Sequence, residues 1–155
     1  MTGGTMKVLV GAAFAAALSM SAAPALAGPL EEANAALDGW AIDYSTGDAD
    51  TLTRSYWPDA TVFGVRKADR ADGSEAIRRY YAAAKRPGEQ ARIGRRASVV
   101  LGPDAVVVHG YYELTRLVDG KPVSSFARFT MLFARRGAEW RIAHEHSSEH
   151  AEARQ

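Results

Sequence analysis

The stretch from 128 to 148 carries the clearest two-residue alternation of side chains in the sequence. Phe129, Met131 and Phe133 occupy every second position, and the residues between them are largely apolar as well. Such a run is typical of a strand that is covered on both faces. A glycine-containing turn at 135–139 then reverses the chain, so the pattern predicts a β-hairpin.

The returning strand ends in a His-x-His pair, which is the most chemically suggestive feature of the sequence. Strict alternation sets Glu145 on one face of this strand. The opposite face then carries four residues, Trp140, Ile142, His144 and His146. Two imidazoles that lie side by side in a sheet can bind a ligand, or one of them can act as a general acid or base.

Two other roles for the pair stay open from the sequence. The imidazoles could hold a metal ion if His109 or Glu113 supplied a third ligand, but His-x-His alone is a weak metal signal. They could also be structural, one bonded in the core and the other at a subunit contact. We take His144 and His146 as the first catalytic candidates and predict no metal site.

Helical spacing of apolar residues predicts an amphipathic helix over about 30–46, with Gly47 as a left-handed cap. Asp48 can cap a second, shorter helix that reaches about Tyr56. We expect a short strand at 60–64 after that helix.

A charged loop over 66–72 separates this strand from a third helix at 75–85, which Ser74 can cap. The remaining chain predicts antiparallel sheet, and Asp119-Gly120 is a strong hairpin signal within it. The expected strands cover 91–101, 105–117, 123–135 and 139–148. This order predicts an α+β fold with its helices on one side of a curved antiparallel sheet, forming a cone that can hold a ligand.

The N-terminal segment predicts a secretory signal peptide over 1–27. Lys7 gives it a basic start, an apolar run too short to span a bilayer follows, and Ala25-Leu26-Ala27 is a small-residue cleavage site. We expect an exported protein, periplasmic or secreted, with one folded domain over 28–148 and a polar tail over 149–155.

The composition of the chain excludes several kinds of partner and several kinds of catalytic site. The formal net charge of the 155-residue chain is +1, so nothing directs it to nucleic acid or to an anionic membrane. The sequence has no cysteine, which excludes disulfides, thiol catalysis and zinc–thiolate sites. No phosphate-binding loop, dinucleotide fingerprint, G-x-S-x-G or H-E-x-x-H motif is present, and we expect no cofactor.

Asp43 and Tyr44, at the end of the first predicted helix, are the other catalytic candidates. A buried carboxyl beside aromatic rings can have a raised pKa and serve as a base. The alternative is that Tyr44 belongs to the core, where the helical stripe places it, and that Asp43 faces water.

Amphipathic aromatic residues can line an apolar pocket and place a hydroxyl group in it. Glu113 and Arg128 lie on adjacent predicted strands, where they could form a buried pair or a solvated surface pair. The candidate pocket residues are Trp40, Tyr81, Tyr111, Glu113, Arg128 and Met131.

Four segments carry a resemblance to a known family: 45–48 (STGD), 56–63 (YWPDATVF), 110–120 with its Gly-Tyr-Tyr and Asp-Gly, and 135–148 with the pattern W-x-x-A-H-x-H-x-S. They resemble the nuclear transport factor 2-like superfamily. Within it the chain is most similar to the calcium/calmodulin-dependent protein kinase II association-domain family and to SgcJ/EcaC-type bacterial proteins, which are SnoaL-like relatives.

The resemblance implies a cone-shaped α+β fold that pairs through the outer face of its sheet. In the kinase family this domain assembles into rings without chemistry of its own, and arginines in its pocket can bind carboxylates. Here those positions carry Glu113, Met131 and Ser147, so the anion site does not carry over. With no kinase domain present, kinase activity does not carry over either.

These observations favour a self-associating module, a homodimer or larger ring, that holds a small apolar or weakly polar ligand in its cone. One alternative is a SnoaL-like lyase or isomerase that moves a proton with a His/Asp or His/Tyr pair. A second alternative is a purely structural oligomerisation domain with a filled cone.

Overall fold

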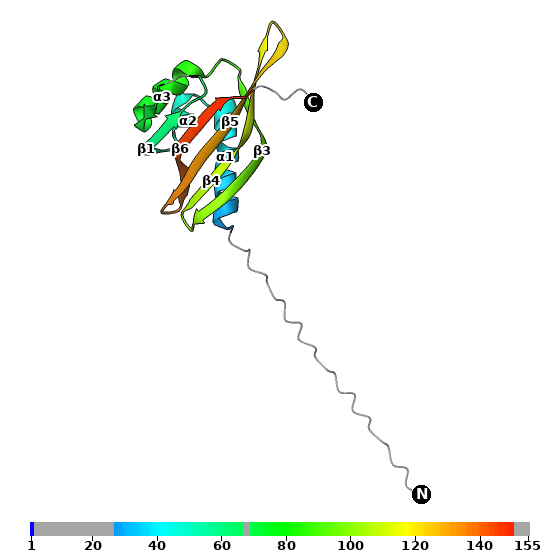
Figure 1. Cartoon of the computed structure of the whole chain (residues 1–155). Helices are drawn as coiled ribbons and strands as arrows, with labels where there is room; N and C mark the ends of the chain where they lie inside the picture. The colour runs from blue at the N-terminus through cyan, green and yellow to red at the C-terminus, as the bar shows by residue number, and fades with distance from the viewer. Residues whose placement is uncertain (2–26, 67–68, 151–155) are drawn as a thin grey trace.

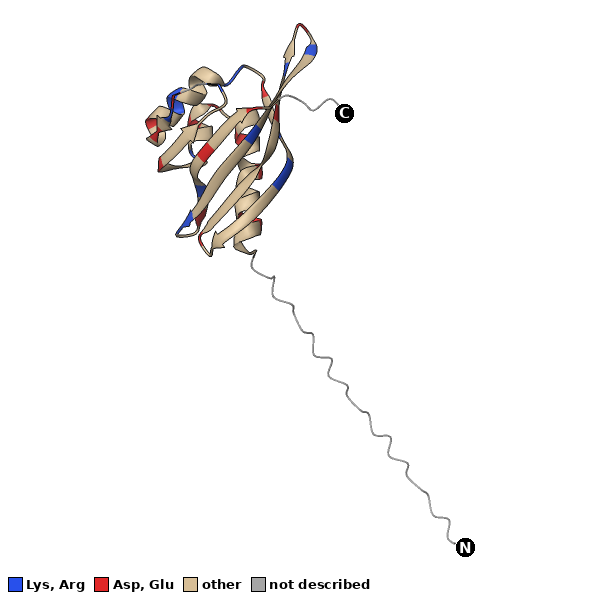
Figure 2. Cartoon of the chain, in the orientation of Figure 1, with Lys and Arg blue, Asp and Glu red and all other residues tan. Residues whose placement is uncertain are grey.

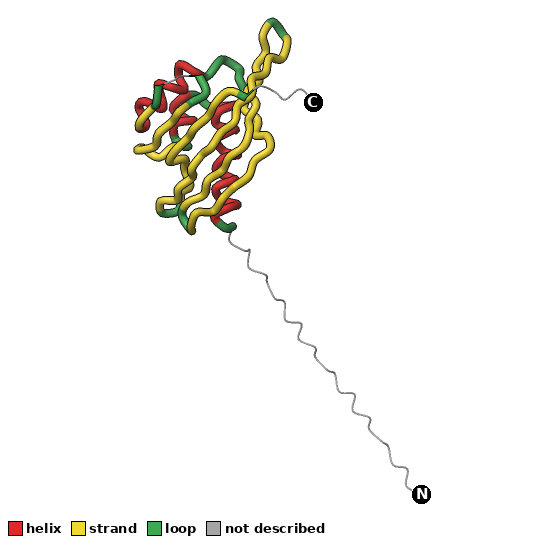
Figure 3. Tube along the Cα trace, viewed as in Figure 1, coloured by secondary structure: helices red, strands yellow, loops and turns green. Residues whose placement is uncertain are grey.

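A six-stranded curved sheet with helices on one face makes up the described part of the chain, as Figure 1 and Figure 3 show. The computed structural model describes residues 1, 27–66 and 69–150. The predicted signal peptide and the predicted C-terminal tail lie outside the described residues except at their edges. No helix in the described ranges is both long enough and apolar enough to cross a membrane.

The elements follow the predicted order, with one short strand added. The helices are α1 (Pro29–Thr46), α2 (Ala49–Thr53) and α3 (Gly73–Ala84). The strands are β1 (Tyr56–Phe63), β2 (Ala71–Asp72), β3 (Gln90–Gly102), β4 (Ala105–Val118), β5 (Lys121–Arg136) and β6 (Glu139–Glu149).

The four long strands form the predicted meander β3-β4-β5-β6 with antiparallel pairing throughout. Asp119 and Gly120 both adopt positive φ, 51° and 74°, as a tight hairpin turn between β4 and β5 requires. The sheet is not purely antiparallel, however. β1 lies parallel to β6, because the two strands are joined by most of the domain rather than by a hairpin.

Several predicted boundaries are corrected. Gly47 has φ −88° and is not a left-handed cap, whereas Asp48 caps α2 as predicted by accepting from the Thr51 amide at 2.8 Å. α2 ends at Thr53, and Tyr56 instead begins a β1 longer than the predicted strand.

The third helix begins two residues earlier than predicted, so Ser74 lies inside it and does not cap it. Ala71 and Asp72, predicted as loop, form the short strand β2 and pair with Thr61 and Val62 at the end of β1.

The core lies between the helices and the inner face of the sheet. Its helical contribution comes from one stripe of α1, spaced three and four residues apart, and from one face of α3, as their patterns predict. The fully buried side chains include Leu37, Trp40, Ile77, Val106, Met131, Phe133 and Ile142.

Candidate functional site

A buried carboxyl group, that of Glu145 on β6, lies at the centre of the inner face. It is 2% exposed and accepts hydrogen bonds from three hydroxyls. Tyr56 donates the shortest, Tyr81 donates at 3.1 Å, and Ser147 donates at 2.7 Å. Trp40 extends the cluster by donating from Nε1 to Tyr56 Oη at 2.8 Å. Residues from α1, β1, α3 and β6 therefore meet in one buried hydrogen-bond network.

A β-bulge puts Glu145 in this position. Ile142 lies opposite Phe133 and His144 lies opposite Leu132, which leaves Ala143 as an extra residue without a partner. One extra residue exchanges the two faces of the strand beyond it. Ile142 and Glu145 both face the core as a result, although alternation would place them on opposite faces.

Burial governs the acidity of this cluster. It raises the pKa of the Glu145 carboxyl above its usual range, against the opposing effect of the bonds from Tyr56, Ser147 and Tyr81. The phenol pKa values of Tyr56 and Tyr81 are also raised, first by burial and then by the nearby carboxyl. The network therefore favours protonated groups that bond to one another.

The inner chamber is almost filled. The free space around Glu145 has a volume of about 10 Å³, which suffices for roughly one water molecule. Aromatic rings occupy the rest of the chamber, including those of Trp40, Tyr44, Tyr80, Tyr81 and Tyr112. Burial also raises the pKa of Tyr80, to about 12.

An ion pair closes the chamber on the side of α3. Arg66 makes two hydrogen bonds of 2.6 Å to the Glu89 carboxylate, which is 1% exposed. Tyr44 donates to the same carboxylate at 2.7 Å, and Arg66 also donates to the Ala84 carbonyl at 2.8 Å. Burial alone would raise the pKa of Glu89, but the bonds from Arg66 and Tyr44 outweigh it and the pKa is lowered.

A larger cleft lies outside this ion pair. Its volume is about 430 Å³, and Arg66, Val65 and Leu114 line both the cleft and the inner chamber. Its other lining residues are Arg86, Ser124, Ser125, Phe126, Ala127, Glu149 and His150. This cleft is large enough to admit a small molecule.

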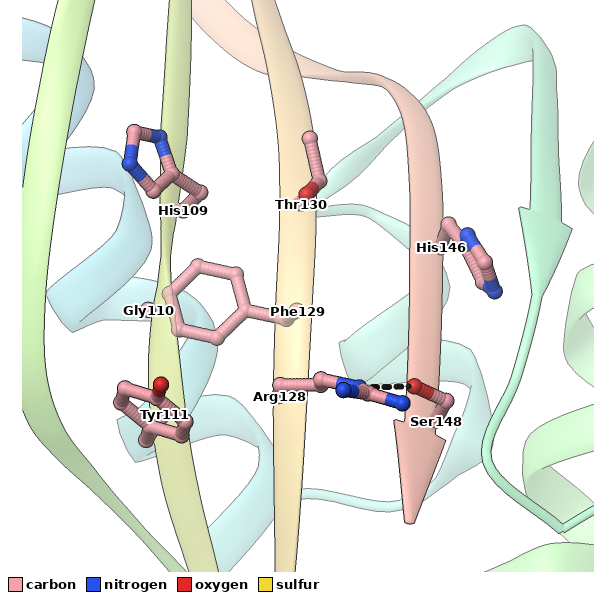
Figure 4. A pocket seen from close by; sticks show the side chains of 8 residues that line it. All are labelled: His109, Gly110, Tyr111, Arg128, Phe129, Thr130, His146 and Ser148. Atoms are coloured by element: carbon pink, nitrogen blue, oxygen red, sulfur yellow. Dashed lines mark hydrogen bonds between the residues drawn. The ribbon is translucent and has the colours of Figure 1, made fainter. Parts of the chain in front are cut away.

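A third concavity, of about 380 Å³, lies on the opposite, outer face of the sheet, and Figure 4 shows its side chains. We call it the outer trough. It is lined by His109, Gly110 and Tyr111 of β4, Arg128, Phe129 and Thr130 of β5, and His146 and Ser148 of β6.

The predicted histidine pair lies on the outer face, away from the inner chamber. The prediction that His144 and His146 share a face with Ile142 is wrong, because the bulge at Ala143 exchanges the faces. His144 contacts Thr61 Oγ1 through Nδ1 at 2.6 Å, and burial followed by the neighbouring imidazole lowers its pKa.

Asp43 and Tyr44 do not join the histidines. Asp43 accepts from Ser55 at 3.0 Å on the helical side of the sheet, and Tyr44 is buried against Glu89. The acid/base pairs considered from the sequence are therefore separated by the sheet. His109 and Glu113 do not complete a metal site either, since no group of three His, Asp or Glu in the described ranges is arranged to hold an ion.

The predicted pocket residues divide between the two faces. Trp40 and Tyr81 line the inner chamber, and Met131 is fully buried in the core. The other three face outward, which corrects the prediction that they line the cone: Tyr111 and Arg128 line the outer trough, and Glu113 pairs with Arg92 at 2.5 Å. Of the two neighbouring tyrosines on β4, Tyr111 therefore faces outward and Tyr112 is buried.

The sequence did not predict the central residues of the two buried polar networks, which are the cluster around Glu145 and the Arg66–Glu89 ion pair. Glu145 was assigned to the wrong face, and Arg66 and Glu89 lie outside every predicted helix and strand. Tyr56 had a usable signal, because it directly precedes the Trp-Pro-Asp segment.

The sequence and the fold both match those of known proteins. The sequence profile of the SnoaL-like domain matches residues 33–152. No curated protein matches the sequence. Among solved structures, the chain is similar to a Xanthomonas campestris protein assigned to the calcium/calmodulin-dependent protein kinase II association domain, with 26% identity and a TM-score of 0.74. That match covers 86% of this chain and 95% of the other.

Two further structures show the same fold at lower identity. A nuclear transport factor 2-like protein from Novosphingobium aromaticivorans has 21% identity and a TM-score of 0.68, covering 81% of this chain and 84% of its own. The association domain of C. elegans calcium/calmodulin-dependent protein kinase II has 18% identity and a TM-score of 0.63, covering 74% and 91%.

Proposed function

The chain belongs to the SnoaL-like domain family, and we propose that it is an exported, self-associating module that binds a small molecule. Self-association is the part with the strongest support. The observation that carries it is an uncharged row of side chains that crosses the outer face of the sheet.

This row is defined by the strand register. Its members lie opposite one another from β3 through β4, β5 and β6 to β1, and they are Val99, Val107, Leu132, His144 and Thr61. Phe63 packs edge-on against His144 and is 39% exposed, and Val99 is 50% exposed. Depletion of charge at the centre of an accessible surface is typical of a protein–protein interface, and Figure 2 shows how few charged positions the central strands carry.

The relatives support the same conclusion. The C. elegans structure is an association domain, and a similar Chlamydomonas structure is a hub homology domain. We propose that this chain pairs through the outer face, as a homodimer or as a building block of a larger ring.

Replacing Leu132 by glutamate tests the interface. Leu132 lies at the centre of the uncharged row, so the new carboxylate would be buried without a partner and should weaken association at least about 100-fold. Sedimentation velocity should show wild type as a dimer or larger and the variant as a monomer.

The matched control is Leu117→Glu, an equally large change at a side chain that is 69% exposed near the end of β4. It should associate like wild type. Circular dichroism should show that both variants are folded. Wild-type association in the Leu132→Glu variant would exclude this face.

The ligand site that we propose is the cleft outside the Arg66–Glu89 ion pair. Its volume of about 430 Å³ lies within the range of small-molecule sites, and it combines apolar side chains with hydroxyls and two arginines. The inner chamber is too full to hold more than water. This favours a binding module over the lyase or isomerase alternative, which also lacks its acid/base pair.

Native mass spectrometry of the protein from its own export compartment tests ligand and export together. We expect a subunit that begins at Gly28, an assembly of two or more subunits, and a bound small molecule that leaves on collisional activation. A mass that includes residues 1–27 would contradict cleavage of the predicted signal peptide. An assembly with nothing bound would favour the purely structural alternative.

A further inference from the structure

The outer trough is built as two rows of three residues, one from each of three adjacent strands. His109, Thr130 and His146 lie directly opposite one another in the first row. The second row consists of Tyr111, Arg128 and Ser148. Adjacent strands lie about 4.8 Å apart, so the three strands place these six residues within a region roughly 10 Å across. All six carry hydrogen-bonding groups, as Figure 4 shows.

The lining is positively charged. Arg128 donates from Nε to Ser148 Oγ at 2.9 Å, a bond that uses one of the five N–H groups of the guanidinium. The Arg95 guanidinium lies over the Tyr111 ring, 5.6 Å from its centre, and adds a second cation at the rim. No Asp or Glu lines the trough in the described part of the chain.

The nearest acid on the same face of β4 is already occupied. Glu113 accepts from Arg92 at 2.5 Å and from Ser124 at 2.7 Å. Arg92 therefore has a carboxylate partner on this face, whereas the trough offers Arg128 only hydroxyls and imidazoles. Among the residues that the structure describes, Arg92 is therefore paired with a carboxylate and Arg128 is not.

We propose that the outer trough binds a small oxyanion, a phosphate or a carboxylate, and that this anion is taken up when two copies pair through the outer face. The proposal rests on the self-association proposed above. The trough lies beside the uncharged row, so pairing would bring the cations of two copies close together and remove them from water. Burying a cation without a partner is strongly unfavourable, and an oxyanion held by the guanidinium removes that penalty.

The linkage has a measurable consequence. A ligand that binds the associated form better than the free form must strengthen association as its concentration rises. In sedimentation velocity at constant pH and ionic strength, replacing chloride by 10 mM phosphate or acetate should tighten association about 5- to 50-fold. A stronger effect of phosphate would indicate a phosphate source, and an effect of acetate that matches it would indicate an organic carboxylate.

Arg128→Gln is the decisive variant, because it removes the charge and keeps an amide for Ser148. It should associate without added oxyanion and lose the response to phosphate. Arg92→Gln is the matched control, since it removes an arginine from the same face that already has a carboxylate partner. It should respond like wild type.

The outcomes separate this inference from the proposed function. If wild type associates equally well in chloride and in both oxyanions, the oxyanion site is wrong and self-association stands. If wild type is monomeric in every salt, self-association is wrong, and calorimetric titration of phosphate tests the trough alone. Saturable binding that is lost in Arg128→Gln would then support the site, and no saturable binding would overturn it. If Arg92→Gln loses the response to the same extent, the oxyanion site is also wrong, because the effect would then come from nonspecific attraction to positive charge.

Discussion

Replacing Glu145 by glutamine is expected to stabilise the protein at pH 8, although the carboxyl lies at the centre of the core and accepts three hydrogen bonds. The reason is its raised pKa, since burial favours the neutral acid over the carboxylate. The folded protein therefore keeps this proton to a higher pH than the unfolded chain, in which the pKa is about 4.5.

The sign of the pH dependence follows from proton binding. Between the unfolded and the folded pKa, the folded state binds more protons, so the free energy of unfolding falls as the pH rises through that window. Each unit by which the folded pKa exceeds the unfolded one costs about 1.4 kcal/mol once the pH is above both. Below the unfolded pKa the acid is neutral in both states and the cost disappears.

Glutamine reproduces the neutral acid without the titration. Its carbonyl can accept from Tyr56 and Tyr81, and its amide can donate to Ser147. We expect the variant to exceed wild type by roughly 1–3 kcal/mol at pH 8 and to differ little from it at pH 4. Urea unfolding followed by circular dichroism at pH 4, 6 and 8 measures both effects.

Glu149→Gln is the control for this experiment, because it makes the same chemical change at the exposed end of the same strand. It should leave the slope of stability against pH as in wild type. A contrary result would be a loss of stability for Glu145→Gln that is larger at pH 8 than at pH 4. Glu145 would then be ionised in the folded protein, with the phenol bonds outweighing burial.

The long strands could be predicted because their determinants are local. Each of the four lies within two residues of its predicted bounds, since alternation and the turn residues between strands act over a few positions. The buried stripe of α1, which includes Leu37, Trp40 and Tyr44, follows from helical spacing in the same way.

The facing of β6 could not be predicted, because one residue decides it. Ala143 carries no sequence mark of a bulge, yet the bulge moves Glu145 inward and both histidines outward. The most suggestive motif in the sequence thereby lies on the surface proposed for self-association. A two-residue period assigns faces correctly only while the register is unbroken.

The Arg66–Glu89 pair was missed for a different reason. The two residues lie 23 positions apart in connecting segments, where no periodicity indicates a tertiary partner. The three-dimensional arrangement shows why the pair matters. The Glu89 carboxylate is 1% exposed, and its bonds to Arg66 are the main interaction that offsets the cost of burying its charge.

Arg66→Met is therefore expected to be among the most destabilising single changes. It removes both hydrogen bonds from the guanidinium to Glu89 and leaves that carboxylate buried with Tyr44 as its remaining side-chain partner. Breaking one side of a buried ion pair costs about 3–5 kcal/mol, a large part of the stability of a single domain. Urea unfolding at pH 7 should show this loss, and Arg66→Lys should lose less, because the charge remains while the paired geometry is gone.

The double variant Arg66→Met/Glu89→Leu shows whether the loss comes from an uncompensated charge or from the space that arginine fills. Removing both charges should restore most of the stability, because the desolvated carboxylate is gone. It should also remove a pH dependence. The lowered pKa of Glu89 adds stability that is present above the unfolded value and lost as the pH falls through the folded one.

Arg78→Met is the surface counterpart, since Arg78 pairs with Glu75 on the exposed side of α3. Its loss of stability should be much smaller than that of Arg66→Met, because water screens an exposed ion pair. If Arg66→Met costs no more than Arg78→Met, the pair does not stabilise the fold. Arg66 could then leave Glu89 at little cost to the stability of the fold.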